Sequence, residues 1–199
     1  MGIEIKKCAV LGAGVMGAQI AGHIANAGIP SLLFDINEEL AKKGVEGLTK
    51  LKPAPLFSSK NISLITACTY DNDLEKLKDC DLIIEAVAEK IEIKHSVYKS
   101  LLPHLKDDAI LASNTSGIPL ANLVEVLPEE VQARFLISHF FNPPRYLRLL
   151  ELVKGPKTSE DVYDTVTEFG EATLGKGIVH AKDTPGFIGN RLINANGRL

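Results

Sequence analysis

The chain has 199 residues, of which 45% are hydrophobic and 24% charged, and its formal net charge of −3 excludes the basic surface of a nucleic-acid-binding protein. We expect no membrane partner, because the apolar runs are short and the start, MGIEIKKCAVLG, carries neither a signal peptide nor a myristoylation signal. Three cysteines far apart favour reduced thiols in a cytoplasmic protein, so we expect neither disulfides nor a metal site.

Apolar runs typical of strands alternate with segments typical of helices. Strands are expected at 6–12, 31–35, 61–66, 81–87, 109–114, 133–138, 147–154 and 175–182. Helices are expected at 15–28, 37–50, 71–78, 91–105, 119–127 and 158–174. Fully apolar strands separated by helices indicate a parallel sheet covered on both sides. We therefore predict an α/β fold of the Rossmann type, a doubly wound and mainly parallel sheet with helices on both faces.

A glycine motif, Gly12-x-Gly14-x-x-Gly17, joins the first predicted strand to the first predicted helix. In this context Gly12 permits a tight turn, Gly14 lets a pyrophosphate approach the backbone, and Gly17 lets helix and strand pack closely. The N–H groups and the dipole at the helix start favour phosphates. The motif predicts a dinucleotide site, and the alternative is a glycine-rich helix that only packs tightly.

Asp35 ends the second predicted strand, about 20 residues after the glycines, where a carboxylate accepts hydrogen bonds from ribose hydroxyls. The same charge repels a 2′-phosphate, and the following residues, Ile36 and Asn37, include no Arg that could bind one. We therefore expect NAD as the cofactor and not NADP.

The segment SHFFNPPRYLRLLE places His139 at the end of one apolar run and Glu151 inside the next. If both runs are neighbouring strands, Leu150 and Leu152 point to one face and Glu151 points to the other. A carboxylate in that position is costly to bury unless it is hydrogen-bonded. We predict a hydrogen-bonded pair of His139 and Glu151. From these residues alone, a core histidine beside a solvated glutamate stays the alternative.

The last segment, DTPGFIGNRLINANGRL, predicts the start of a helical second domain, with Asp183 or Thr184 as the helix cap and Pro185 in the first turn. The expected division is 1–184 for the nucleotide-binding domain and 185–199 for the first helix of the truncated second one. Exposed apolar residues on that helix predict either self-association, as in a homodimer, or terminal disorder; they are Phe187, Ile188, Leu192 and Ile193.

Five sequence blocks resemble the 3-hydroxyacyl-CoA dehydrogenase family over nearly the whole chain. They are GAGVMGAQIA, EAVAEKIEIK, ASNTSGI, HFFNPPRYLRLLELV and KDTPGFIGNR. The resemblance implies NAD-dependent oxidation of an L-3-hydroxyacyl-CoA to a 3-ketoacyl-CoA in fatty-acid beta-oxidation. It is nearest to the long bacterial type that is fused to an enoyl-CoA hydratase region.

The same resemblance implies roles for individual residues. His139 is the general base and Glu151 its partner, while Ser116, Asn142 and Asn190 contact the acyl-CoA substrate. The implied cofactor-binding residues are Gly12, Gly14, Val15, Met16, Gly17, Asp35, Ile36, Glu89, Lys94 and Asn114. Four histidines are interpreted as structural or solvated; they are His23, His95, His104 and His180. Ser113 and Thr115 are interpreted as residues that satisfy backbone groups after the strand. For Lys94 the alternative to cofactor binding is an ordinary charge on a helix face.

The chain departs from the family pattern in two places. The connection across 36–61 is shorter than the family's helical excursion, whose basic residues help to hold CoA, so no CoA-binding residue is named. The chain also stops soon after GFIGNR, which leads to an alternative function, an isolated NAD-binding domain that is inactive without its C-terminal partner. A structural protein such as the lens lambda-crystallins is disfavoured, because His139, Glu151, Ser116 and Asn190 are all present.

Overall fold

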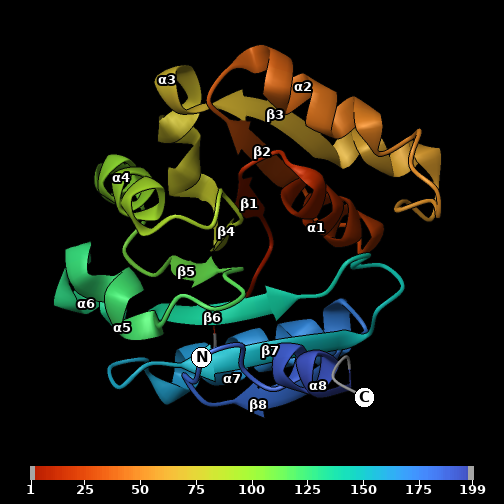
Figure 1. The fold of residues 1–199 in the computed structure, drawn as a ribbon. Helices are drawn as coiled ribbons and strands as arrows, with labels where there is room; N and C mark the ends of the chain where they lie inside the picture. The colour runs from red at the N-terminus through yellow and green to blue at the C-terminus, as the bar shows by residue number, and fades with distance from the viewer. Residues whose placement is uncertain (1–2, 197–199) are drawn as a thin grey trace.

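The computed structural model describes residues 3–196 and is built on one eight-stranded sheet. The strand order is β3-β2-β1-β4-β5-β6-β7-β8 (Figure 1). All neighbours from β3 to β6 are parallel, β7 runs antiparallel to β6, and β8 is parallel to β7. The predicted Rossmann-type, mainly parallel α/β fold is thus confirmed.

The elements follow the alternation of apolar strands and helices along the chain. The strands are β1 Cys8–Leu11, β2 Ser31–Asp35, β3 Ile65–Thr69, β4 Leu82–Glu85, β5 Ile110–Ser113, β6 Phe135–Phe140, β7 Leu149–Lys154 and β8 Gly177–Ala181. The helices are α1 Val15–Asn26, α2 Glu38–Gly47, α3 Tyr70–Asp73, α4 Ile91–Leu101, α5 Leu120–Leu123, α6 Glu129–Gln132, α7 Glu160–Glu168 and α8 Gly189–Asn196. A π-helical turn, Phe169–Thr173, extends α7.

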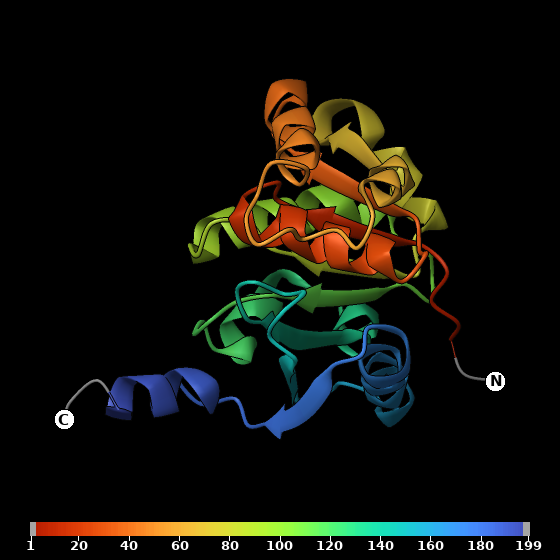
Figure 2. The ribbon, with the colours of Figure 1, turned by 90° about the vertical axis from the view of Figure 1, so that its right-hand side faces the viewer.

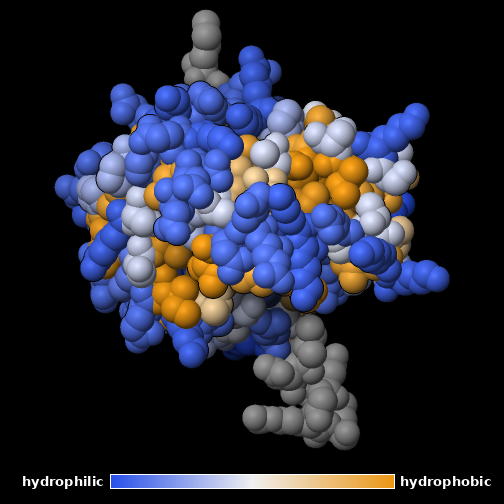
Figure 3. All heavy atoms as spheres, turned by 90° about the horizontal axis from the view of Figure 1, so that it is seen from above, coloured by the Kyte–Doolittle hydropathy of each residue, from blue (hydrophilic) through white to orange (hydrophobic). Residues whose placement is uncertain are grey.

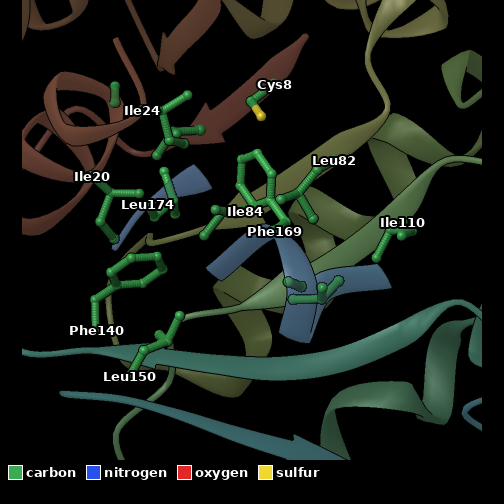
Figure 4. Close-up of a cluster of buried hydrophobic side chains, with 14 of the residues drawn as sticks. Cys8, Ile20, Ile24, Leu82, Ile84, Ile110, Phe140, Leu150, Phe169 and Leu174 are labelled. Atoms are coloured by element: carbon green, nitrogen blue, oxygen red, sulfur yellow. The ribbon is translucent and has the colours of Figure 1, made fainter. Parts of the chain in front are cut away.

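Helices cover both faces of the sheet, with α1, α2 and α7 on one face and α3 to α6 on the other (Figure 1). Figure 4 shows the core on the α1 face, where Ile20 lies near Phe140 of β6 and Leu150 of β7. Because side chains alternate along a strand, the neighbours His139 and Glu151 project from the opposite face. Burial of Phe140 and Leu150 therefore decides which way the histidine and the carboxylate point.

Two sequence-based expectations for element boundaries are wrong. The strand expected at 61–66 begins only at Ile65, because residues 59–64 form a 3₁₀ turn that Asn26 ties to the end of α1. The Asn26 side-chain oxygen accepts hydrogen bonds from the Phe57 N–H and from the Asn61 amide. The residues after this turn form β3, which pairs in parallel with β2 from Ile65 opposite Ser31 to Thr69 opposite Asp35.

The last helix begins at Gly189 and not near Pro185, and neither expected residue caps it. The Asp183 carboxylate instead accepts from the Leu120 N–H at the start of α5. Residues 185–188 form a turn, and α8 projects from the edge where the parallel strands end (Figure 2). This turn brings the C-terminal segment beside the end of β6.

The surface seen from the β3 edge is largely hydrophilic, with separate apolar areas (Figure 3). Large apolar side chains that are well exposed include Val15, Ile36 and Phe57. Within residues 3–196, no helix combines the length and the apolar character that crossing a bilayer requires.

Candidate active site

The glycine loop connects β1 to α1 at the edge where the parallel strands end. Gly12 has a φ of 99°, and a Cβ there would lie 2.6 Å from the Ala86 carbonyl oxygen. A Cβ on Gly17 would lie 1.8 Å from the Gly12 oxygen, so α1 can start against β1 only with glycine at this position. A Cβ on Gly14 meets nothing within 4 Å, which leaves open space beside the first turn of α1. These environments fit the predicted dinucleotide loop.

Asp35 lies at the end of β2, beside this loop. Its carboxylate accepts hydrogen bonds of 2.7 Å from the Ala13 N–H and from the Ile36 N–H. A groove of about 310 Å³ between α1 and α2 adjoins Gly14 and Asp35. The carboxylate thus both orders the glycine loop and lies at an open edge, where a ribose hydroxyl can reach it. The N–H groups of Val15 and Met16 belong to the first turn of the helix that follows.

His139 and Glu151 face each other across the antiparallel pair of β6 and β7. The His139 Nδ1 lies 2.8 Å from the Glu151 Oε2, and the side chains are 5% and 0% exposed. The hydrogen bond predicted from the sequence is therefore present. Because Nδ1 contacts a carboxylate, it carries the proton in the neutral ring, and Nε2 is left with a lone pair. No protein group among the described residues bonds to that Nε2.

The second oxygen of Glu151 holds the start of α8. Its Oε1 accepts hydrogen bonds from the Ile188 N–H at 2.9 Å and from the Gly189 N–H at 2.7 Å. One turn into the helix, the Asn190 amide donates to the Ser116 carbonyl oxygen at 3.3 Å. Glu151 therefore links the histidine to the helix that carries Asn190, and Asn190 in turn lies against the loop that carries Ser116.

Two aromatic rings enclose the histidine. Ring centroids lie 4.5 Å apart for His139 and Phe141 and 5.6 Å apart for His139 and Phe187. The expectation that Phe187 is exposed is wrong, since its side chain is 1% exposed. Its φ of 47° turns the ring back into the core, whereas Ile188 and Leu192 are exposed as expected. The side chain of Ile193 lies outside the described residues.

A second carboxylate, Glu85, ends β4 and is fully buried. Its Oε1 accepts from the Lys94 ammonium at 2.6 Å and from the Val87 N–H, and its Oε2 accepts from Tyr98 and Ser113 hydroxyls. Burial, followed by the charge of Glu85, raises the pKa of Tyr98 well above its usual value. Sequence reasoning missed Glu85, although it carries the signal that identified Glu151, a carboxylate inside an apolar strand.

Lys94 extends this network to the loop after β5. It is 1% exposed and also lies 3.3 Å from Glu89, whose other oxygen accepts from the Thr115 hydroxyl and the Ser116 N–H. Burial opposes ionisation of Glu89, but these hydrogen bonds and the Lys94 charge outweigh it and lower the pKa of Glu89. Lys94 is thus not an ordinary helix-face charge, since its ammonium is buried between two carboxylates, while its predicted contact with the cofactor stays a prediction.

The remaining residues named from the sequence lie around the same edge or have structural partners. The Asn114 side-chain oxygen accepts from the Phe140 N–H at 2.8 Å, which holds the loop after β5 against the end of β6. His23 bonds to the Leu174 carbonyl, and burial, followed by the Lys176 charge, lowers the pKa of His23 to about 4. The other structural histidines also have partners, Asn122 for His95, Glu75 for His104 and Tyr163 for His180.

Known proteins are similar to this chain in sequence and in fold. Residues 7–184 match the family described as "3-hydroxyacyl-CoA dehydrogenase, NAD binding domain". The chain is 47% identical to a putative fatty acid oxidation complex trifunctional enzyme of Rickettsia felis, over 95% of this chain and 27% of that protein. It is also 47% identical to a probable 3-hydroxyacyl-CoA dehydrogenase of Deinococcus radiodurans, over 96% of this chain and 57% of that protein.

The solved structure of (S)-3-hydroxybutyryl-CoA dehydrogenase PaaH1 from Ralstonia eutropha is similar, with a TM-score of 0.83 at 30% identity. The match covers 96% of this chain and 68% of that one. The chain spans 27% and 57% of the length of the two relatives above. The match to the family model includes the glycine loop, Asp35, Ser116, His139 and Glu151. The chain therefore belongs to the 3-hydroxyacyl-CoA dehydrogenase family, which it matches over the NAD-binding domain.

Proposed function

We propose that this chain binds NAD and supplies the general base for oxidation of an L-3-hydroxyacyl-CoA to a 3-ketoacyl-CoA, a step of fatty-acid beta-oxidation. The observation that carries the proposal is the buried His139–Glu151 hydrogen bond at the same sheet edge as the glycine loop. Ligands of doubly wound sheets bind at the ends of the parallel strands. Both halves of a dehydrogenase site are therefore on one edge.

Bound NAD would accept the hydride that leaves C3 of the substrate. The chain would hold the NAD by N–H groups of the glycine loop and by Asp35. Oxidation of the C3 hydroxyl also releases a proton, and His139 Nε2 is the free lone pair that can take it. Glu151 keeps the other ring nitrogen protonated and stabilises the imidazolium as it forms. The shell of Phe141 and Phe187 excludes water around this ring.

Substrate positioning falls to polar groups on three segments. Ser116 and Asn190 are joined by a hydrogen bond, and Asn142 follows β6 three residues after His139. We propose that these side chains hold the oxygens of the acyl group so that C3 faces the cofactor. The remaining proposed cofactor positions are Ile36, Glu89 and Asn114, on loops that follow β2, β4 and β5, and Lys94, on α4.

The second candidate function is an NAD-binding module that needs a further domain for turnover. It is supported by the exposed apolar side chains of Ile188 and Leu192 and by the greater length of the relatives. The same exposed residues support self-association through α8. Three free, buried cysteines support the proposed cytoplasmic location.

The two candidate functions separate in one experiment. We expect the 199-residue chain to bind NADH in a calorimetric titration, because the loop and Asp35 are complete. NADH consumption with acetoacetyl-CoA then reports whether the chain also turns over, and its absence with intact NADH binding selects the binding module. A chain that binds no NADH would contradict both functions. His139→Ala is the control, since it should stop turnover and leave NADH binding in place.

Cofactor preference is expected to depend on Asp35. The Asp35→Asn change keeps an oxygen for the Ala13 N–H, gives up the acceptor for the Ile36 N–H, and removes the charge that repels a 2′-phosphate. We expect NADH affinity to fall by about tenfold, equivalent to about 1.4 kcal/mol, and the gap to NADPH to narrow. Calorimetric titration with both nucleotides measures this. Glu39→Gln, an equal charge change on an exposed residue of α2, should alter neither affinity. Equal NADH and NADPH affinities in the unchanged chain would refute the assignment.

A further inference from the structure

Ser116 lies in the loop that follows β5, and its backbone is held from two sides. Its N–H donates to the Glu89 Oε1 at 2.9 Å, and its carbonyl oxygen accepts from the Asn190 amide at 3.3 Å. The residue is exposed, and no protein group among residues 3–196 bonds to its hydroxyl. The hydroxyl is therefore the polar group of this serine that is left for a ligand.

The same contacts join this serine to the catalytic pair. Asn190 is the second residue of α8, and Glu151, the partner of His139, holds the start of that helix. Phe187, just before the helix, packs against the histidine ring. Ser116 and the proposed proton acceptor are thus linked through one helix start, at the same edge of the sheet.

Thr115, which precedes this serine, is fully buried, and its hydroxyl uses its one hydrogen and both of its lone pairs. The hydroxyl donates to the same Glu89 Oε1 and accepts from the Ile118 N–H at 3.1 Å and from the Gly117 N–H at 3.4 Å. Packing does not hold Gly117, because a Cβ there would meet nothing within 4 Å. The Thr115 hydroxyl is therefore the group that closes the turn around Ser116.

We propose that Thr115 is a positioning residue for the reaction, which directs the Ser116 hydroxyl to an oxygen of the acyl-CoA substrate. This inference rests on the proposed function and extends it to a threonine that the sequence indicates only as a partner for backbone groups. A substrate has to be held close to its productive geometry, so a hydroxyl on an exposed loop contributes little unless that loop is fixed. Thr115 fixes the turn, and it also orients Glu89, which holds the Ser116 N–H.

The competing explanation is that the Thr115 hydroxyl only stabilises the fold. Thr115→Val distinguishes the two explanations, because valine has a similar shape but its side chain neither donates nor accepts a hydrogen bond. If Thr115 acts through Ser116, Thr115→Val weakens acetoacetyl-CoA binding only while the Ser116 hydroxyl is present. If Thr115 is only structural, the valine leaves that affinity unchanged or has an equal effect with and without the Ser116 hydroxyl.

The experiment compares Thr115→Val, Ser116→Ala, their double variant and Thr115→Ser with the unchanged chain. Acetoacetyl-CoA affinity is obtained by calorimetry at saturating NAD, with which this ketone cannot react. We expect Thr115→Val and Ser116→Ala each to weaken binding by roughly tenfold, as for one lost hydrogen bond, and the double variant to match Ser116→Ala. Thr115→Ser keeps the hydroxyl and should stay within about twofold of the unchanged chain. If the valine variant does not fold, Thr115→Ala takes its place.

Thr158→Val is the matched control. The Thr158 hydroxyl is also buried, donates to the Phe135 carbonyl and accepts from the Gly155 N–H, but it lies at the start of β6, whereas His139 lies near the end of that strand. This variant should leave acetoacetyl-CoA affinity unchanged, while circular dichroism verifies that every variant is folded.

Three results would overturn the role of Thr115 and leave the proposed function in place. They are unchanged acetoacetyl-CoA binding in Thr115→Val, binding by Thr115→Ser that is as weak as by Thr115→Val, and additive losses in the double variant. An unchanged chain that binds neither NAD nor acetoacetyl-CoA would overturn both the role of Thr115 and the proposed function.

Discussion

Replacing Glu151 by glutamine is expected to lower the turnover of NADH-dependent acetoacetyl-CoA reduction by about 10²- to 10⁴-fold, the range for loss of acid–base catalysis. The amide oxygen can still accept the Ile188 and Gly189 N–H groups, so α8 should stay in place. The amide nitrogen then faces His139 Nδ1 and donates to it. This selects the tautomer with a proton on Nε2, which removes the lone pair that proton transfer needs.

The measurement is kcat in whichever chain shows turnover, the 199-residue one or a longer family member in which the same glutamate is replaced. NADH affinity should stay within about twofold, because Glu151 contacts the histidine and α8 and is absent from the glycine loop. Glu171→Gln, an exposed position beyond α7, is the control for the charge change. A Glu151→Gln variant as fast as the unchanged protein, or one whose NADH affinity falls together with its rate, would contradict the proposed role.

Removing the Lys94 ammonium is expected to lower the free energy of unfolding more than any other change predicted here. Lys94→Met leaves the fully buried Glu85 carboxylate without its cation, and breaking a buried ion pair from one side costs about 3–5 kcal/mol. For a chain of this size the midpoint of thermal unfolding should fall on the order of 10 °C. Thermal and denaturant unfolding followed by circular dichroism measure both quantities.

The double variant Glu85→Gln, Lys94→Met should recover much of that loss. The Tyr98 and Ser113 hydroxyls can rotate to accept from the new amide, while its oxygen keeps the Val87 N–H. Lys157→Met serves as control, because its pair with Glu129 is exposed and solvent screens it. If the double variant is less stable than Lys94→Met alone, the ion pair is not what holds this network together.

The parts of the fold and site that the sequence predicted depend on local patterns. The glycine loop needs particular residue types at fixed spacing, and the alternation along β6 and β7 alone puts His139 opposite Glu151. The fully apolar runs predicted strands of a mainly parallel sheet that is covered on both faces. Each of these features is determined by a few residues that are close together in the sequence, so one sequence is enough to predict it.

The features that could not be predicted depend on contacts between distant segments. The contact of Lys94 with Glu85 could not be predicted, because only the packing of α4 on β4 brings the ammonium to that carboxylate. Phe187 looked exposed, because its burial depends on one left-handed backbone conformation. Asp183 looked like the cap of the last helix, but its carboxylate serves α5, which lies 63 residues earlier.

The division of Glu151 between His139 and α8 affects how this protein can be cut into parts. A fragment that stops at residue 184 would keep the histidine and the glutamate but lose both N–H donors that satisfy the carboxylate's second oxygen. It would also lose the Phe187 ring that shields the histidine. A buried oxygen without donors draws water or a new partner. The smallest unit with an undisturbed His139–Glu151 pair therefore extends at least to Gly189, past the end of the sheet.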